Sequence, residues 1–207
     1  MWYKVKKIYQ WTNLVRPAIY EYSYDFRNKS SSQLSADWWS VLWWTLETWS
    51  SWITSPVGKD VSLWHSVDLS TAKKITIDTS IVWNRNDSYW DRAMSFWIRR
   101  NQSWASDYLQ FYIASAVASY HWTVIKMRFS WTTTEWTNIG SIWTSSYTPK
   151  LILDLESKTA TWKISWYNNS TYTLSDAQIT AIRNMSYFYV YATQHNFYIQ
   201  NISITVE

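Results

Sequence analysis

Short runs in which apolar and polar residues alternate recur from one end of the sequence to the other. In one of them, Met94, Phe96 and Ile98 share one side of an extended chain, while Ser95 and Arg99 share the other. A period of two residues is typical of a half-buried β-strand. Further segments of strand character are 20–26, 41–46, 75–82, 109–113, 125–129, 151–155, 161–166, 186–192 and 198–206. The sequence therefore predicts an all-β chain.

Turns rich in Ser, Thr and Asn separate these segments, and such spacing is typical of an antiparallel two-sheet jelly-roll sandwich. We predict one short helix near 175–184. Ser175 is followed three residues later by Gln178, which forms a capping-box pattern, and Asp176 suits the first helical turn. Because the sequence contains no evident linker, we expect one sandwich domain over 18–207, preceded at 1–17 by a leader or an edge strand.

Tryptophan and glycine occur in unusual numbers, with 19 Trp and 2 Gly in 207 residues. Many tryptophans stand in Ser, Thr and Asn clusters, where glycine normally supplies a positive φ. One interpretation is that UGA codons for glycine were read as tryptophan. The alternative is a truly Trp-rich chain whose exposed indoles stack on sugars. We expect most tryptophans in turns, at strand ends or on the surface, and Trp162 and Trp166 facing inward.

Charge and composition argue against several classes of protein. The net charge of +4 is dispersed, whereas a nucleic-acid binder usually carries a dense basic stripe. No stretch approaches the roughly 20 apolar residues that span a bilayer, so we expect no membrane insertion. The absence of cysteine excludes disulfides and thiolate metal sites. The first residues lack an apolar core, so no signal peptide is expected.

Catalytic and metal-binding patterns are weak. Asp154 and Glu156 share a strand face. We expect them to lie at an exposed hairpin end and not to form the acid pair of a glycosidase. No nucleophile elbow occurs, and His65, His121 and His195 lack metal-ligand spacing. We therefore expect no enzyme and no cofactor. A calcium loop is conceivable at Asn86, Asp87 and Asp91, although Arg85 and Arg92 argue against it.

A glycan site needs an aromatic face for the C–H surface of a sugar and polar groups for its hydroxyls. We expect the side chains that point outward from 94–99, 108–113 and 125–129 to supply both, if these strands are neighbours. The candidate ligand-binding residues are Arg99, Tyr108, Gln110, Tyr112, Lys126 and Arg128. The alternative is a sheet face that is merely solvated.

Segments 22–26, 36–39, 151–161 and 196–204 together resemble the concanavalin A-like lectin/glucanase jelly roll, a family that includes laminin-G-like domains. The resemblance covers roughly 20–206 and implies a two-sheet sandwich with a concave face that often binds glycans. Segment 6–17 resembles a short leader found on bacteriophage structural and tail-associated proteins; alternatively, it is an edge strand or a loose arm.

These observations favour a noncatalytic lectin-like module of a phage virion that binds a glycan or host-surface polysaccharide and contacts other virion proteins. Its expected location is the virion or an extracellular surface. Two alternatives remain. The first is a purely structural head, tail or decoration protein, and the second is a glycoside hydrolase of the same fold, which the missing acid triplet disfavours.

Overall fold

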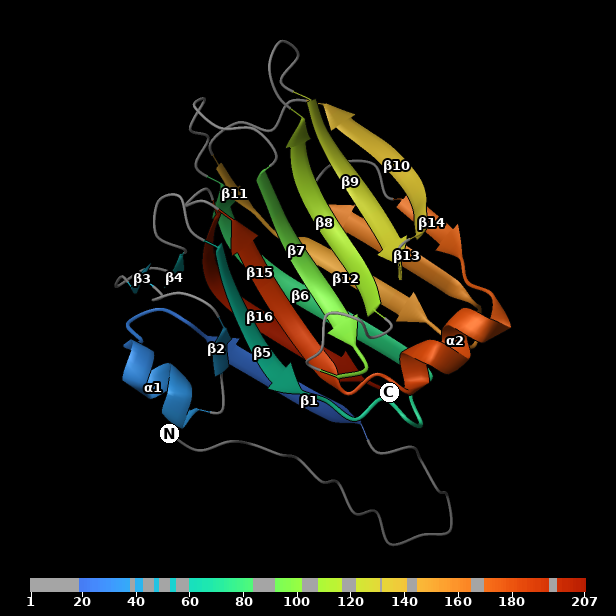
Figure 1. The fold of residues 1–207 in the computed structure, drawn as a ribbon, viewed down its shortest axis with the longest axis horizontal. Helices are drawn as coiled ribbons and strands as arrows, with labels where there is room; N and C mark the ends of the chain where they lie inside the picture. Colours follow the sequence, from blue (N-terminus) through green and yellow to red (C-terminus); the bar gives the residue numbers. More distant parts are fainter. Residues whose placement is uncertain are drawn as a thin grey trace, which may run out of the picture.

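The computed structural model describes residues 19–37, 40–42, 47–48, 53–54, 60–83, 92–101, 108–116, 122–130, 132–140, 145–164, 170–193 and 197–207, some of them as backbone alone. These residues form two stacked antiparallel sheets with few helices (Figure 1), which confirms the predicted all-β jelly-roll sandwich. The leader at 1–17 lies outside the described residues. None of the helices within the described ranges is long and apolar enough to cross a membrane.

Sheet A contains nine strands among the described residues. Its main order is β14 (Ser170–Thr173), β13 (Thr159–Ile164), β12 (Pro149–Asp154), β6 (Lys74–Trp83), β16 (Phe197–Val206), β4 (Ile53–Thr54) and β3 (Glu47–Thr48). In addition, β1 (Tyr20–Asp25) pairs with β16, and β11 (Ser145–Tyr147) pairs with β6. Strands from both ends of the described chain therefore lie side by side in this sheet.

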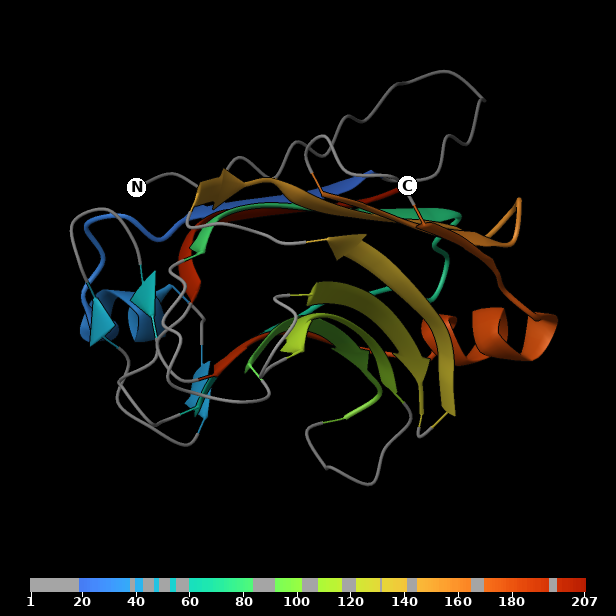
Figure 2. The ribbon, with the colours of Figure 1, turned by 90° about the horizontal axis from the view of Figure 1, so that it is seen from above.

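Sheet B contains seven strands among the described residues. Their order is β10 (Thr132–Gly140), β9 (Trp122–Phe129), β8 (Tyr108–Ala116), β7 (Arg92–Arg99), β15 (Tyr187–Thr193), β5 (Asp60–Ser66) and β2 (Ser40–Leu42). Figure 2 shows that sheet B arches beneath the flatter sheet A. The face of sheet B that points away from sheet A is concave, and it is called the concave face below.

The core lies between the two sheets. Along β12 and β13 buried and half-exposed residues alternate strictly, as the sequence pattern predicts for a sheet with one wet face. Trp162 is 2% exposed, and its indole stacks on Phe111 of sheet B, with ring centroids 5.7 Å apart. The inward placement predicted for Trp162 is confirmed, whereas Trp166 lies outside the described residues.

Helix α2 (Asp176–Arg183) confirms the short helix predicted near 175–184. The Ser175 hydroxyl accepts a hydrogen bond from the Gln178 backbone N–H, and the Gln178 side chain accepts one from the Ser175 backbone N–H. This capping box satisfies donors that the first helical turn would leave unpaired. The helix connects β14 of sheet A to β15 of sheet B.

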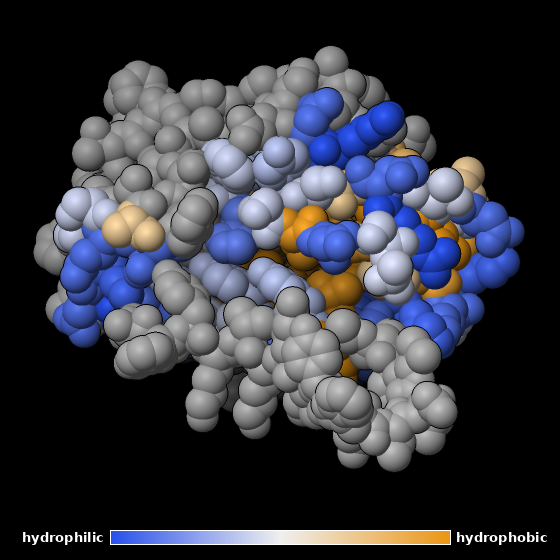
Figure 3. Space-filling model, turned by 90° about the horizontal axis from the view of Figure 1, so that it is seen from below, coloured by the Kyte–Doolittle hydropathy of each residue, from blue (hydrophilic) through white to orange (hydrophobic). Residues whose placement is uncertain are grey.

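A second short helix, α1 (Ser31–Ala36), was not predicted from the sequence. In Figure 3 hydrophilic residues gather over α1 at the left and α2 at the right, and hydrophobic residues show between them. The two helices therefore flank opposite ends of this edge of the sandwich.

Six of the described strands were also missed by the period-two pattern, namely β3, β4, β5, β10, β11 and β14. Strand β10 is an edge strand with the sequence TTTEWTNIG, which lacks regular apolar alternation. An edge strand needs less apolar surface than a central one, because it has a neighbour on one side alone. Strands β11 and β14 contain three and four residues, too few to establish a period.

Candidate functional site

The backbone register brings the six predicted ligand-binding residues onto the concave face. Strands β7, β8 and β9 are neighbours, and Arg99 pairs with Tyr108, Gln110 with Arg128, and Tyr112 with Lys126. Alternate positions of the same strands supply core residues, so the six positions share the opposite face. The side chains of Tyr112 and Lys126 lie outside the described part of the structure.

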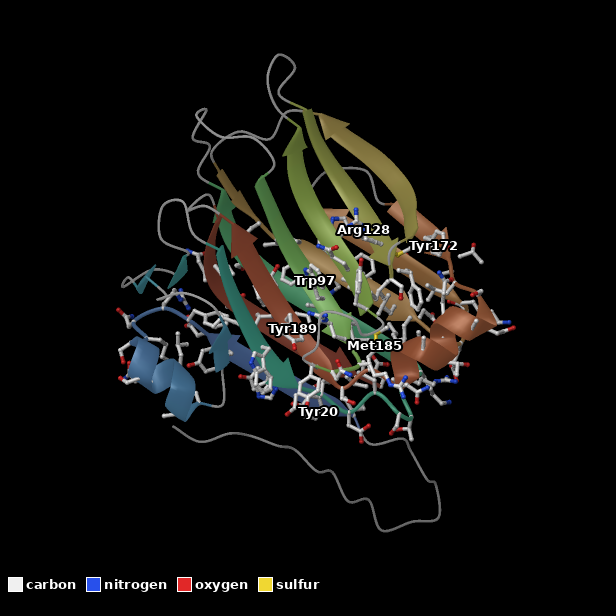
Figure 4. The ribbon with its side chains drawn as sticks, viewed as in Figure 1. Tyr20, Trp97, Arg128, Tyr172, Met185 and Tyr189 are labelled. Carbon is white, nitrogen blue, oxygen red and sulfur yellow. The ribbon has the colours of Figure 1, made fainter. Side chains whose placement is uncertain are left out.

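These pairs belong to three cross-strand rows, which are named here after one member each. The Arg99 row joins Tyr187, Arg99 and Tyr108. The Gln110 row joins Trp64, Tyr189, Trp97, Gln110 and Arg128. The Tyr112 row joins Tyr191, Ser95, Tyr112 and Lys126. Figure 4 shows three members of the Gln110 row, Arg128, Trp97 and Tyr189, in one line across sheet B.

The alternative of a merely solvated sheet face does not hold for three of these side chains. Arg99 is 3% exposed, Tyr108 is 2% exposed and Gln110 is 8% exposed. They point away from the core between the sheets, yet they are buried. Arg99 and Tyr108 pack against neighbouring aromatic rings, whereas Arg128 is half-exposed.

Arg99 is the centre of this packing. Its guanidinium carbon lies 5.3 Å from the ring centroid of Trp97 and 5.4 Å from that of Tyr189. Both distances are within the range of cation–π attraction, which holds a cation against the negative face of an aromatic ring. Burial lowers the pKa of Arg99, while the phenols of Tyr189 and Tyr108 act in the opposite direction. Because arginine ionises far above neutral pH, the group remains a cation.

Trp97 completes the cluster and was missed by the sequence analysis. Its ring centroid lies 5.0 Å from that of Tyr108, and the ring is half-exposed. Alternation with Arg99 places Trp97 on the concave face, so the period-two pattern contained the necessary signal. The signal was overlooked because tryptophans were interpreted as residues of turns, strand ends and surface.

Trp64 and Tyr189 were also missed, and each contributes a buried polar atom. Within the described part of the chain, neither the Trp64 Nε1 nor the Tyr189 hydroxyl has a hydrogen-bond partner. Burial raises the pKa of Tyr189, so its phenol is a neutral donor near pH 7. Buried polar atoms normally find partners. The two atoms are suited to hydrogen bonds with an enclosed water molecule.

The carboxyl pair at Asp154 and Glu156 forms an exposed hairpin end, as the sequence suggested. The Asp154 carboxylate accepts hydrogen bonds from the backbone N–H groups of Glu156 and Ser157, at 3.1 and 2.8 Å. These bonds, chiefly the one from Ser157, lower the pKa of Asp154. Glu156 instead forms an ion pair with Lys73 at 2.8 Å. A glycosidase acid needs a raised pKa, so this geometry does not suit acid catalysis.

Of the three histidines, His65 alone falls within the described residues. Its Nδ1 lies 2.7 Å from the Ser66 carbonyl oxygen, and its ring lies 4.3 Å from that of Tyr22. Burial lowers the pKa of His65.

No group of three or more His, Cys, Asp or Glu residues suited to a metal occurs among the described residues. Asn86, Asp87 and Asp91 lie outside them, so the calcium loop stays a prediction.

No protein-family model matches the sequence, and no curated protein does so either. Solved structures do match. Winged bean acidic lectin complexed with methyl-α-D-galactose has a TM-score of 0.73 at 8% identity, over 91% of this chain and 98% of the lectin. Peanut lectin has a TM-score of 0.63 at 10% identity, over 91% of this chain and 98% of its own.

A third structure is the CBM2 module of the evolved Dit from Lactobacillus casei BL23 phage J-1. Its TM-score is 0.66 at 6% identity, over 89% of this chain and 94% of the module. The chain has the concanavalin A-like, legume lectin-like jelly-roll fold. At such low identities the likeness concerns the fold, and the residues of the concave face have to be assessed by their own chemistry.

Proposed function

We propose that this jelly roll is a noncatalytic glycan-binding module and that the concave face of sheet B is its site. The observation that carries the proposal is the Arg99 cluster, in which Trp97 and Tyr189 hold a buried guanidinium on an outward sheet face. Buried, ordered polar groups beside an accessible aromatic ring are what recognition of a sugar requires.

Each residue has a distinct proposed role. Trp97 is half-exposed, so its ring is the platform on which the C–H face of a sugar stacks. Tyr108 is too deeply buried to touch a ligand, and it supports Trp97 from the side. Gln110, next to Trp97 in the register, and Arg128 beyond it supply hydrogen bonds to sugar hydroxyls. Tyr112 and Lys126 extend the site by one row.

The similarity to lectins and to a phage carbohydrate-binding module supports this proposal at the level of the fold. We further propose that the protein is part of a phage virion and contributes to attachment to the host surface. The phage Dit module and the leader-like segment 6–17 support this role. Mass spectrometry of purified virions tests it: absence of the chain from the particle would overturn the virion assignment.

Binding of saccharides by the purified chain tests the proposed function. A glycan array should identify ligands for the natural sequence, and Trp97→Ala should weaken their binding about tenfold, which corresponds to about 1.4 kcal/mol. The matched control is Tyr20→Ala, which removes a half-buried aromatic ring from sheet A. A control variant that loses binding equally, or a Trp97→Ala variant that keeps it, would contradict the site.

Failure of the natural sequence to bind any saccharide would leave the structural alternative, in which the sandwich is a spacer within the particle. The glycoside hydrolase alternative predicts cleavage of β-glucans by the purified chain. The geometry of Asp154 and Glu156 argues against it.

We also propose that UGA recoding explains part of the excess of tryptophan. Of the 19 tryptophans, six lie within the described ranges. Trp83 and Trp122 are at strand ends, and the other four lie inside strands. The contacts of Trp162 and Trp97 support a native indole at these two positions. Tandem mass spectrometry of the natural protein decides each site, and an intact mass of 24.9 kDa would contradict recoding altogether.

A further inference from the structure

Exposure alternates from strand to strand along the Gln110 row. Trp64 on β5, Trp97 on β7 and Arg128 on β9 are half-exposed. Tyr189 on β15 and Gln110 on β8, which lie between them in the register, are 3% and 8% exposed. Side chains that a ligand can reach therefore recur on every second strand of sheet B.

This spacing is close to the length of a disaccharide. Neighbouring strands lie about 4.8 Å apart, so the exposed positions of the row are separated by about 9.6 Å across the sheet. Two sugar units of an extended β-1,4-linked chain cover a similar length. In such a chain each unit is turned over relative to the one before it, so every second unit presents the same face. The repeat of the row thus matches the repeat of this class of glycan.

We propose that the concave face binds an unbranched β-1,4-linked chain that runs along the Gln110 row, across the strands; this inference rests on the proposed function. The direction follows the line of Arg128, Trp97 and Tyr189 in Figure 4. One sugar unit stacks on Trp97, and the second unit along stacks on Trp64. The second unit in the other direction accepts hydrogen bonds from Arg128. A bound pentasaccharide therefore spans the row.

Trp64 is suited to be the second stacking residue. Its chain neighbour Leu63 belongs to the core, so alternation places the indole on the concave face. Tyr187 packs against the indole in an edge-to-face arrangement, with ring centroids 5.3 Å apart. Tyr108 supports Trp97 in a similar way, and both tyrosines belong to the Arg99 row. Two tryptophans, each held by a tyrosine of the neighbouring row, thus lie at corresponding positions.

Oligosaccharides of increasing length test the repeat. Isothermal titration calorimetry measures the affinity of cello-, chito- and manno-oligosaccharides from di- to hexasaccharides. In the series that binds, the affinity should rise about tenfold from the di- to the trisaccharide, which is the first to reach both tryptophans. It should rise again from the tetra- to the pentasaccharide, which is the first to reach Arg128 as well. An affinity that stops rising at the disaccharide would overturn the inference.

Two variants of Trp64 assign the second stacking contact. Trp64→Ala should weaken binding of the pentasaccharide about tenfold and that of the disaccharide no more than about twofold, because the disaccharide can still stack on Trp97. Trp64→Phe keeps an aromatic ring and should retain the pentasaccharide affinity within about threefold. Binding of the disaccharide also shows that each variant is folded. An equal loss for both lengths, or no loss for either, would overturn the inference.

The linkage is tested with a chain of the same length. Maltopentaose has α-1,4 linkages, which do not present alternate units with the same face, and it should bind at least about tenfold more weakly than the β-1,4-linked pentasaccharide. Equal affinity would overturn the inference. Binding of another array saccharide but of none of the three β-1,4-linked series would also overturn it and leave the proposed function intact. If the array is blank and no series binds, the proposed function fails together with the inference.

Discussion

The outer face of sheet A and the concave face of sheet B are both turned away from the core, yet they differ in construction. Along β12, core residues alternate with half-exposed Lys150, Ile152 and Asp154. On β8, by contrast, the four consecutive residues from Tyr108 to Phe111 are all buried. Along β12, sheet A therefore has one buried face and one solvent-exposed face, whereas the centre of sheet B is buried on both of its faces.

Sheet B thus buries polar side chains whose desolvation is energetically unfavourable. A buried arginine and a buried glutamine need specific partners, because desolvation of polar groups is unfavourable. A face that only had to stay soluble would carry the short polar and charged residues of sheet A. The aromatic and cationic residues of the concave face are better explained by binding.

The largest expected effect concerns the core that the two sheets share. Trp162→Ala should destabilise the domain by about 3 to 5 kcal/mol, because it removes a buried ring that stacks on Phe111. Urea unfolding measures the change. The adjacent Thr161→Ala, on the outer face of sheet A, removes an exposed hydrogen bond to Thr171 and should cost no more than about 1 kcal/mol. Similar losses of stability for the two variants would contradict the assignment of one side of β13 to the core and the other side to solvent.

Two buried tyrosines, one in each sheet, provide a test with an effect on stability of intermediate size. The Tyr24 hydroxyl of sheet A donates a hydrogen bond to Asp37 at 2.7 Å, so Tyr24→Phe should cost about 1 to 2 kcal/mol. The Tyr189 hydroxyl of sheet B has no partner among the described residues. Tyr189→Phe should therefore leave stability nearly unchanged. A large loss of stability in Tyr189→Phe would show that this hydroxyl does form a stabilising hydrogen bond.

The smallest expected effect depends on pH and concerns the contact between β1 and β5. Burial lowers the pKa of His65 below the 6.5 of the unfolded chain. Between the two values the unfolded state binds more protons, so stability falls as the pH decreases from about 6.5. The lowered pKa values of Asp25 and Asp154 act in a more acidic window, below 3.8. His65→Gln should reduce the loss of stability between pH 7 and 5; an unchanged loss would show that His65 is not its source.

Prediction from sequence succeeded where the signal is local in the chain. Alternation located β12 and β13 of sheet A and β7, β8 and β9 of sheet B, and the capping box at Ser175 and Gln178 located α2. The burial of Arg99 and Gln110 was not foreseen. It depends on rows that join residues from β5, β15, β7, β8 and β9, far apart in the sequence. Register of this kind cannot be read from any single segment.

Trp97 illustrates a second limit. Its strand position was evident, but the abundance of tryptophan in turn-like segments led to an interpretation in which few indoles had structural roles. The structure places this indole against Tyr108 and the Arg99 guanidinium. Composition suggested a property of the tryptophans as a group, whereas packing assigns a role to each one separately.

The central claim is that a saccharide binds on the concave face of sheet B and not on sheet A. The most direct test is an NMR titration that follows the indole N–H signals of Trp64, Trp97 and Trp162, each assigned by its Trp→Phe variant. A saccharide selected from the array should shift the signals of Trp64 and Trp97 and leave that of Trp162, in the core, unchanged. Unchanged signals of Trp64 and Trp97 at saturating saccharide would contradict the account.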